Sequence, residues 1–256
     1  MLSPFSVLKD VFAVLGRNFL SILTAFSSLF CVYSFVQFIG SVSSICFASS
    51  VMNGTENIDF TRFERVAFLP SSTISTFAFF VLFLPLFLGT ERMSLKWTSG
   101  EKPRLSELLW AFEPRRFLAT FILHLSLFFT LLIWSVAVIF PTLVFSANLS
   151  VSAATFLSCI FYGIGLCGGV VIITFFLAVS LVFVGGNSLK FAFLSALGKG
   201  GTKGLFSSLL PLVTAFLPLV FFSGLFIIFA PIFVLLSAAI FDRVWYQKSR
   251  TKTATT

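Results

Sequence analysis

Charged residues are scarce in this chain and unevenly spread. Only 10% of its 256 residues are Asp, Glu, Lys or Arg, against about 25% in an ordinary soluble domain. A soluble domain needs charge over its whole surface, whereas a charge in the middle of a bilayer costs about 2.5–3.5 kcal/mol. The pattern excludes an ordinary soluble protein and predicts a single integral membrane domain over residues 1–256. Charged residues are absent from four long stretches, 18–55, 66–90, 117–189 and 204–241.

Residues that carry chemistry are also few. A metal site needs three or four ligands, and a phosphate loop needs Gly-Lys-Ser or Gly-Lys-Thr after a glycine-rich turn. The sequence has neither pattern, and its four cysteines lie in hydrophobic stretches without C-x-x-C spacing. We therefore expect no catalytic residue, no metal, no cofactor and no enzymatic activity. The cysteines are Cys31, Cys46, Cys159 and Cys167.

His124 is the only histidine, and it lies in a hydrophobic stretch. No acidic residue is present in any predicted span to pair with it, and paired carboxylates are what proton relays in membranes use. We take His124 as a possible intramembrane polar site. A structural histidine, bonded to a neighbouring serine or to the backbone, is favoured over a relay or a metal ligand.

The charge-free stretches are long enough for six membrane crossings. About 20 residues cross a ~30 Å hydrocarbon core, so residues 117–189 hold two crossings and residues 204–241 are too long for one. Pro141 with the small polar residues 146–150 predicts a turn, and Pro218 precedes a second break. The prediction is an all-α, six-helix transmembrane bundle. The predicted spans are 19–42, 68–89, 118–140, 158–184, 205–221 and 225–241.

Two shorter segments have the spacing of amphipathic helices that lie along a membrane surface. One covers residues 4–17, for which a water-exposed extension of the first span is an equal alternative. The other begins at Pro103 and is stopped by Pro114. Their apolar stripes are Phe5, Leu8, Val11, Phe12 and Leu15 in the first segment, and Leu105, Leu108, Leu109 and Phe112 in the second.

The basic residues predict the orientation. Six spans place nearly all of the 17 Lys and Arg on the side of both chain ends, whereas five spans divide them more evenly. Since Lys and Arg keep short loops in the cytoplasm, we predict cytoplasmic N- and C-termini and a basic face that contacts anionic lipid headgroups. The net charge of +8 is spread over several short segments, so nucleic acid is not an expected partner.

Gly165 and Gly169 form a G-x-x-x-G pair in the predicted span 158–184. Small residues let membrane helices approach closely, so this pair is a possible helix-packing seam. Packing within the chain is favoured over a specific dimer, which stays an alternative.

Three local features occur in order along the chain: residues 96–109 after the second hydrophobic stretch, residues 187–206 ahead of the last hydrophobic pair, and a last span that contains Pro231. In these features the chain resembles a family of bacterial polytopic integral membrane proteins of uncharacterised function, related to the membrane domain of some glycerophosphodiester phosphodiesterases. The resemblance implies a multi-pass module of the cytoplasmic (inner) membrane without a catalytic site.

We expect a non-enzymatic role as a membrane scaffold, regulator or assembly partner of other membrane proteins. Ion-coupled carriers generally need a pair of acidic or basic groups inside the membrane to meet the moving charge, and the predicted spans contain no such pair. Two alternatives stay open. One is a transporter or permease for a neutral or amphiphilic small molecule or lipid, and the other is a pathogen protein inserted into a host-derived membrane.

Overall fold

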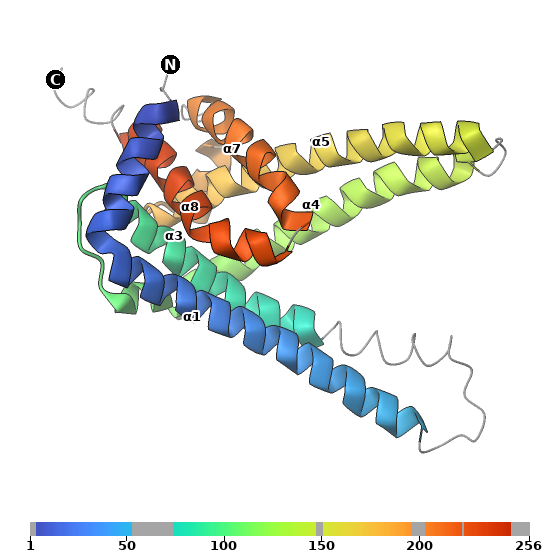
Figure 1. Cartoon of the computed structure of the whole chain (residues 1–256), viewed down its shortest axis with the longest axis horizontal. Helices are drawn as coiled ribbons and strands as arrows, with labels where there is room; N and C mark the ends of the chain where they lie inside the picture. The colour runs from blue at the N-terminus through green and yellow to red at the C-terminus, as the bar shows by residue number, and fades with distance from the viewer. Residues whose placement is uncertain (1–3, 53–73, 147–150, 196–202, 222, 247–256) are drawn as a thin grey trace.

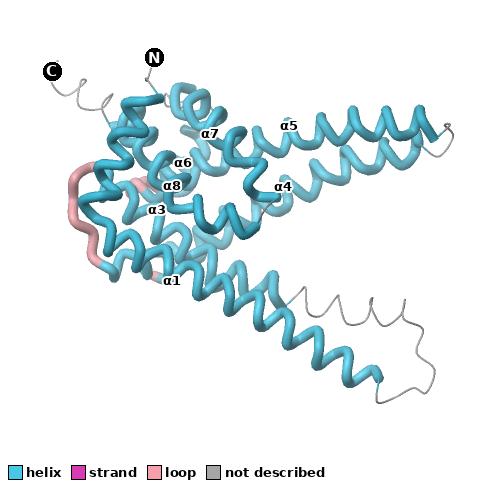
Figure 2. Tube along the Cα trace, viewed as in Figure 1, coloured by secondary structure: helices cyan, strands magenta, loops and turns pink. Residues whose placement is uncertain are grey.

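The fold is helical throughout the part of the chain that the structure describes (Figures 1 and 2). This computed structural model describes residues 4–52, 74–146, 151–195, 203–221 and 223–246. Four of its helices are long and apolar enough to cross a membrane, which confirms the membrane class. These candidate spans are Ser6–Ser43, Ile74–Thr98, Pro114–Val144 and Ser152–Val184.

The first helix, α1 (Pro4–Met52), is kinked at Asn18. Asn18 has non-helical backbone angles, and its side-chain amide donates to the Val14 carbonyl at 3.1 Å. The predicted stripe of the segment before the kink is divided between the protein core, where Val11 is buried, and the surface. The buried residues of this segment are valines of the protein core, whereas Leu8 and Phe12 of that stripe are 40% and 56% exposed. The buried valines are Val7, Val11 and Val14.

The second candidate span begins, within the described residues, at Ile74. It contains a π-helical turn, η1 (Phe79–Phe83), and continues as α3 (Leu84–Thr98). The predicted span 68–89 therefore ends too early, and its residues 68–73 lie outside the described residues. Sequence analysis ended it before Glu91 and Arg92, whose charges are accommodated by packing and ion pairing.

The connector after α3 forms a 3₁₀ helix, η2 (Leu105–Phe112). Its predicted apolar stripe is divided between two environments, because Leu108 is buried while Leu105 and Leu109 are 53% and 61% exposed. Gly89 of α3 makes the contact possible: a Cβ atom there would collide with the backbone of Leu108. The backbone of η2 is thus in direct contact with α3 at Gly89.

A long hairpin follows, made of α4 (Pro114–Ser146) and α5 (Val151–Val184), which run side by side away from the other helices (Figure 1). Pro141 lies inside α4, so the predicted turn does not begin there, and residues 147–150 of that prediction lie outside the described residues. Membrane helices tolerate an interior proline because only one backbone hydrogen bond is lost locally. α5 ends at Val184, as the predicted span 158–184 does, although it starts earlier.

The remaining elements are short. α6 (Leu189–Leu194) is capped by Ser188, whose hydroxyl accepts from the Phe191 N–H. α7 (Lys203–Phe221) and α8 (Ser223–Phe241) are separate helices that meet at the predicted break, and the π-helical turn η4 (Asp242–Tyr246) follows.

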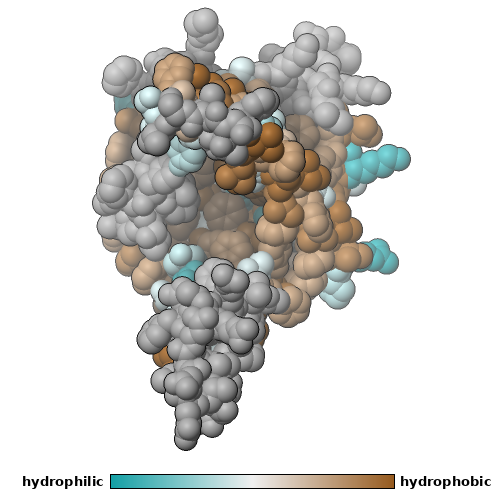
Figure 3. Space-filling model, turned by 90° about the vertical axis from the view of Figure 1, so that its right-hand side faces the viewer, coloured by the Kyte–Doolittle hydropathy of each residue, from teal (hydrophilic) through white to brown (hydrophobic). Residues whose placement is uncertain are grey.

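The core lies where α1, α3, α5 and α8 meet, and both chain ends lie beside it (Figure 1). Residues 176–184 of α5 and 234–241 of α8 are almost wholly buried there. Two arms leave the core on the side away from the chain ends: α1 with the segment from Ile74, and the α4–α5 hairpin. Viewed from the side toward which the arms extend, the described surface is mostly hydrophobic and is hollowed between the arms (Figure 3).

Candidate functional site

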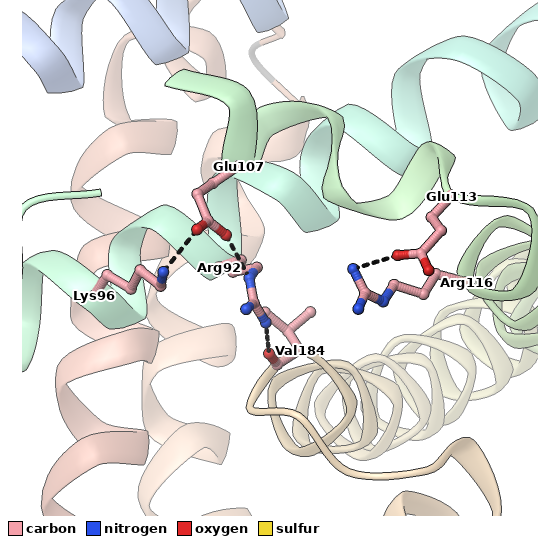
Figure 4. A network of polar contacts seen from close by, with 6 residues as sticks. All are labelled: Arg92, Lys96, Glu107, Glu113, Arg116 and Val184. Carbon is pink, nitrogen blue, oxygen red and sulfur yellow. Dashed lines mark hydrogen bonds and ion pairs between the residues drawn. The ribbon is translucent and has the colours of Figure 1, made fainter. Parts of the chain in front are cut away.

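A network of charged side chains joins the end of α3 to its neighbours (Figure 4). Arg92 Nε donates to Glu107 Oε2 at 2.6 Å, and Lys96 Nζ donates to Glu107 Oε1 at 2.7 Å. Arg92 Nη1 also donates to the carbonyl of Val184 at 3.1 Å. A cation at the last carbonyl of a helix interacts favourably with the helix dipole, so Arg92 ties α3 to both η2 and the end of α5.

The two cations determine the electrostatics of Glu107. Partial burial by itself raises the pKa of this carboxyl, but the hydrogen bonds and charges of Lys96 and Arg92 outweigh that effect. The pKa of Glu107 is therefore lowered below its usual value. At neutral pH the Glu107 carboxylate is therefore charged, and its ion pairs with Lys96 and Arg92 hold the connector against α3.

Trp110 of η2 lies beside two guanidinium groups. The Arg92 and Arg116 guanidinium carbons lie 4.8 Å and 4.9 Å from its ring centroid, and Arg116 also pairs with Glu113 at 2.6 Å. Phe183 of α5 packs on the same indole, with the ring centroids 5.5 Å apart. Such cation–π contacts contribute about 0.5–2 kcal/mol each. The cluster holds the connector in place and has no arrangement typical of catalysis.

Glu91 is the functional candidate that sequence reasoning missed. Its side chain is 1% exposed, and Oε1 lies 3.3 Å from the hydroxyl of Ser180 on α5. The candidate span Ile74–Thr98 therefore contains an acid, against expectation. Glu91 follows the buried Leu88 by three residues and lies on the same side of the helix, but the burial of that side is visible only in the structure. An acid inside a span is a functional-site hypothesis because burial without a cation is costly.

Two further polar side chains continue this buried side of α3. Glu91 Oε2, Ser94 Oγ and Trp97 Nε1 are buried and have no hydrogen-bond partner in the part of the chain that the structure describes. They follow one another at three-residue steps, which places them along one side of the helix. The core thus contains a row of three polar side chains among mostly hydrophobic residues.

His124, the histidine singled out from the sequence, lies in the first half of α4. Its Nδ1 is 2.8 Å from the carbonyl of Thr120, one turn earlier in the helix. The ring lines a pocket of about 370 Å³ between α1, the segment from Ile74 to Leu84, and α4. Glu91 does not line this pocket, so the structure does not bring the acid and the histidine into one site.

The two glycines of the predicted seam differ in their surroundings. Gly165 faces α4: a Cβ there would lie 3.2 Å from Val138, and its carbonyl accepts from the indole N–H of Trp134 at 3.0 Å. A Cβ at Gly169 would meet nothing within 4 Å. Gly168, and not Gly169, packs closely against α4 together with Gly165, because a Cβ at Gly168 would collide with the Trp134 ring.

The described residues contain no group of three or more His, Cys, Asp or Glu side chains placed to hold a metal ion. Three of the four cysteines, Cys31, Cys159 and Cys167, are exposed free thiols, and the side chain of Cys46 lies outside the described set. No protein-family model, no curated protein and no solved structure matches the chain.

Proposed function

We propose that this chain is a six-span protein of a bacterial cytoplasmic membrane, with both ends in the cytoplasm, that acts without catalysis as an assembly partner of other membrane proteins. The packing of α7 against α8 as two helices supports the count of six. The distribution of basic residues supports the orientation. The family resemblance supports the bacterial setting.

The α4–α5 hairpin carries the assembly role. No residue is buried in the most apolar 18-residue stretch of the α4 span, although the corresponding stretch of α5 is 61% buried. α4 and the first part of α5 therefore lie largely outside the bundle formed by the other helices, whereas residues 176–184 of α5 belong to its core. Such a hairpin presents long helix faces at the depth of the lipid, where helices of other proteins pack.

One face of α5 is shaped for a partner helix. Thr155, Cys159, Gly163 and Cys167 follow at four-residue spacing and are all exposed. Gly163 precedes Gly165 by two residues, about 200° around the helix, so this stripe points away from α4. Small residues at this spacing allow close approach of a second helix. We define these four residues as the α5 stripe.

The two cysteines of the α5 stripe supply the test. Mild oxidation of native membranes is expected to join the chain to its partner through Cys159 or Cys167, giving a reducible band of higher mass. Gly163→Leu, which fills the middle of the stripe, is expected to abolish that band. Tyr162→Leu is the matched control, because Tyr162 is exposed on the adjacent face and the band should persist.

The mass of the product separates the kinds of partner. A band at twice the chain mass means a second copy, and any other mass means a different protein. The proposal fails if neither cysteine gives a product, or if the product is equally strong in the Gly163→Leu and Tyr162→Leu variants.

A further inference from the structure

The pocket beside His124 lies well inside the membrane region. His124 is eight residues after Arg116, a helical rise of about 12 Å, which puts it near the middle of a ~30 Å core. The volume of about 370 Å³ falls within the range of small-molecule sites, roughly 300–1,000 Å³. Thr76 and Phe128 of its lining are exposed, so the pocket opens sideways toward lipid.

Polar groups in this pocket have bonding capacity that the chain does not use. Most span hydroxyls, such as those of Ser126 and Thr130, donate to a carbonyl of the preceding turn and need no other partner. His124 differs. A carbonyl only accepts, so Nδ1 donates to Thr120 and Nε2 of the neutral ring remains an acceptor. Within the described residues no hydrogen bond reaches Nε2.

Gln37 is the second such group. It is an exposed residue of α1 that lines the same pocket, and no hydrogen bond of its amide is found among the described residues. In hydrocarbon an amide without partners costs several kcal/mol, since no water is present to replace them. The Gln37 amide and the Nε2 acceptor of His124 lie in one pocket. They therefore indicate a ligand whose polar group can both donate and accept a hydrogen bond.

Apart from the small hydroxyl residues Ser75 and Thr76, the rest of the described lining is apolar. Phe79 and Phe80 both line the pocket, and Phe80 contacts Phe128 across it, with the ring centroids 6.0 Å apart. The π-helical turn η1 brings the two adjacent phenylalanines to this side, and π-bulges occur frequently at functional sites. No Lys, Arg, Asp or Glu is among the described residues that line the pocket, so a charged ligand would find no counter-charge there.

We propose that this pocket binds an uncharged lipid that carries a hydroxyl group. The hydroxyl donates to Nε2 of His124 and accepts from the amide of Gln37, while the hydrocarbon chain lies against the phenylalanines and leaves toward the bilayer. This binding is independent of the assembly role, because the α5 stripe lies on a different helix and does not line the pocket.

The test uses the full-length protein in lipid nanodiscs and a long-chain alcohol with a photoreactive diazirine in its chain. Irradiation and peptide mapping are expected to place the label in residues 74–84 and 124–131. The unlabelled alcohol should compete about tenfold better than its methyl ether, which accepts but cannot donate, because one hydrogen bond is lost. The fatty acid of the same length, which is charged, should compete poorly.

Variants of the protein identify the side chain that binds the hydroxyl group of the ligand. The preference for alcohol over ether is measured within each variant, so differences in yield cancel. His124→Leu should abolish this preference, and His124→Gln, which keeps an acceptor, should retain part of it. Ser126→Ala, on the same helix but outside the pocket, should leave it unchanged. Equal competition by alcohol and ether in the wild type, an unchanged preference in His124→Leu, strong competition by the fatty acid, or labelling elsewhere would each overturn the proposal.

Discussion

Replacing Gly89 with alanine is expected to destabilise the protein, although the same change in a helix normally stabilises it. Alanine is favoured over glycine in helix interiors by about 0.5–1 kcal/mol. At Gly89, however, the new Cβ collides with the backbone of Leu108, which cannot rotate away as a side chain does. Overpacking costs about 1–3 kcal/mol, and we expect the upper part of that range here. The net loss is then about 1–2 kcal/mol.

The measurement is the thermal unfolding midpoint of the purified protein in detergent. A loss of this size lowers the midpoint by about 2–8 °C for a chain of this length. Gly169→Ala is the matched control, because a Cβ there meets nothing within 4 Å and the helix gains only the preference for alanine. The order expected is Gly169→Ala at or above wild type, and Gly89→Ala clearly below it. If Gly89→Ala unfolds at or above Gly169→Ala, then η2 does not pack on α3 through its backbone, and our account of the connector is wrong.

Three more substitutions test the charged connector after α3 and the core. Glu107→Gln should cost about 1–2 kcal/mol at neutral pH, whereas the same change at the exposed Glu101 should leave the stability at neutral pH close to that of the wild type. Because the pKa of Glu107 is lowered in the folded state, the cost of Glu107→Gln is fully present above the ordinary value of 4.5 and disappears as pH falls through the lowered pKa in thermal unfolding scans from pH 7 to 3. Glu91→Gln should be at least as stable as wild type, since a carboxylate buried without a cation costs several kcal/mol; a large loss of stability would show that the charge itself is needed. Gly186→Ala should lose about 1 kcal/mol by the same assay, because Gly186 has a φ of +99°; unchanged stability would argue against that conformation.

Sequence reasoning succeeded where a helix boundary depends on local residues. The charge-free stretch 204–241 contains two helices, α7 and α8, as its length led us to expect, and the end of α5 at Val184 coincides with the two glycines that follow it. These boundaries need no knowledge of distant contacts. Local composition was enough to place them.

Sequence reasoning failed where a charged residue is paired by a group that is distant in the sequence. Arg92 marks the end of a hydrophobic stretch in the sequence, but its charge is met by Glu107 of η2 and by the last carbonyl of α5. The helix therefore continues through it. The prediction of a turn at Pro141 failed for a different reason, since a proline ends a helix in water more readily than in lipid. Burial of Glu91 likewise depends on α5, which the spacing within α3 does not reveal.

The contact between the two ends of the chain has a consequence for biosynthesis. Arg243 bonds to Ser6 and pairs with Asp10, and α8 packs on the first part of α1. α1 is therefore completed by α8, which is made after α3, α4, α5 and α7. Val7, Val11 and Val14 of the newly made chain lack this packing until α8 is present, and such exposed apolar surface favours misassembly. A chain stopped before residue 223 would insert its earlier helices and still lack the partner of its first one, so quality control can recognise it by its uncovered N-terminal segment.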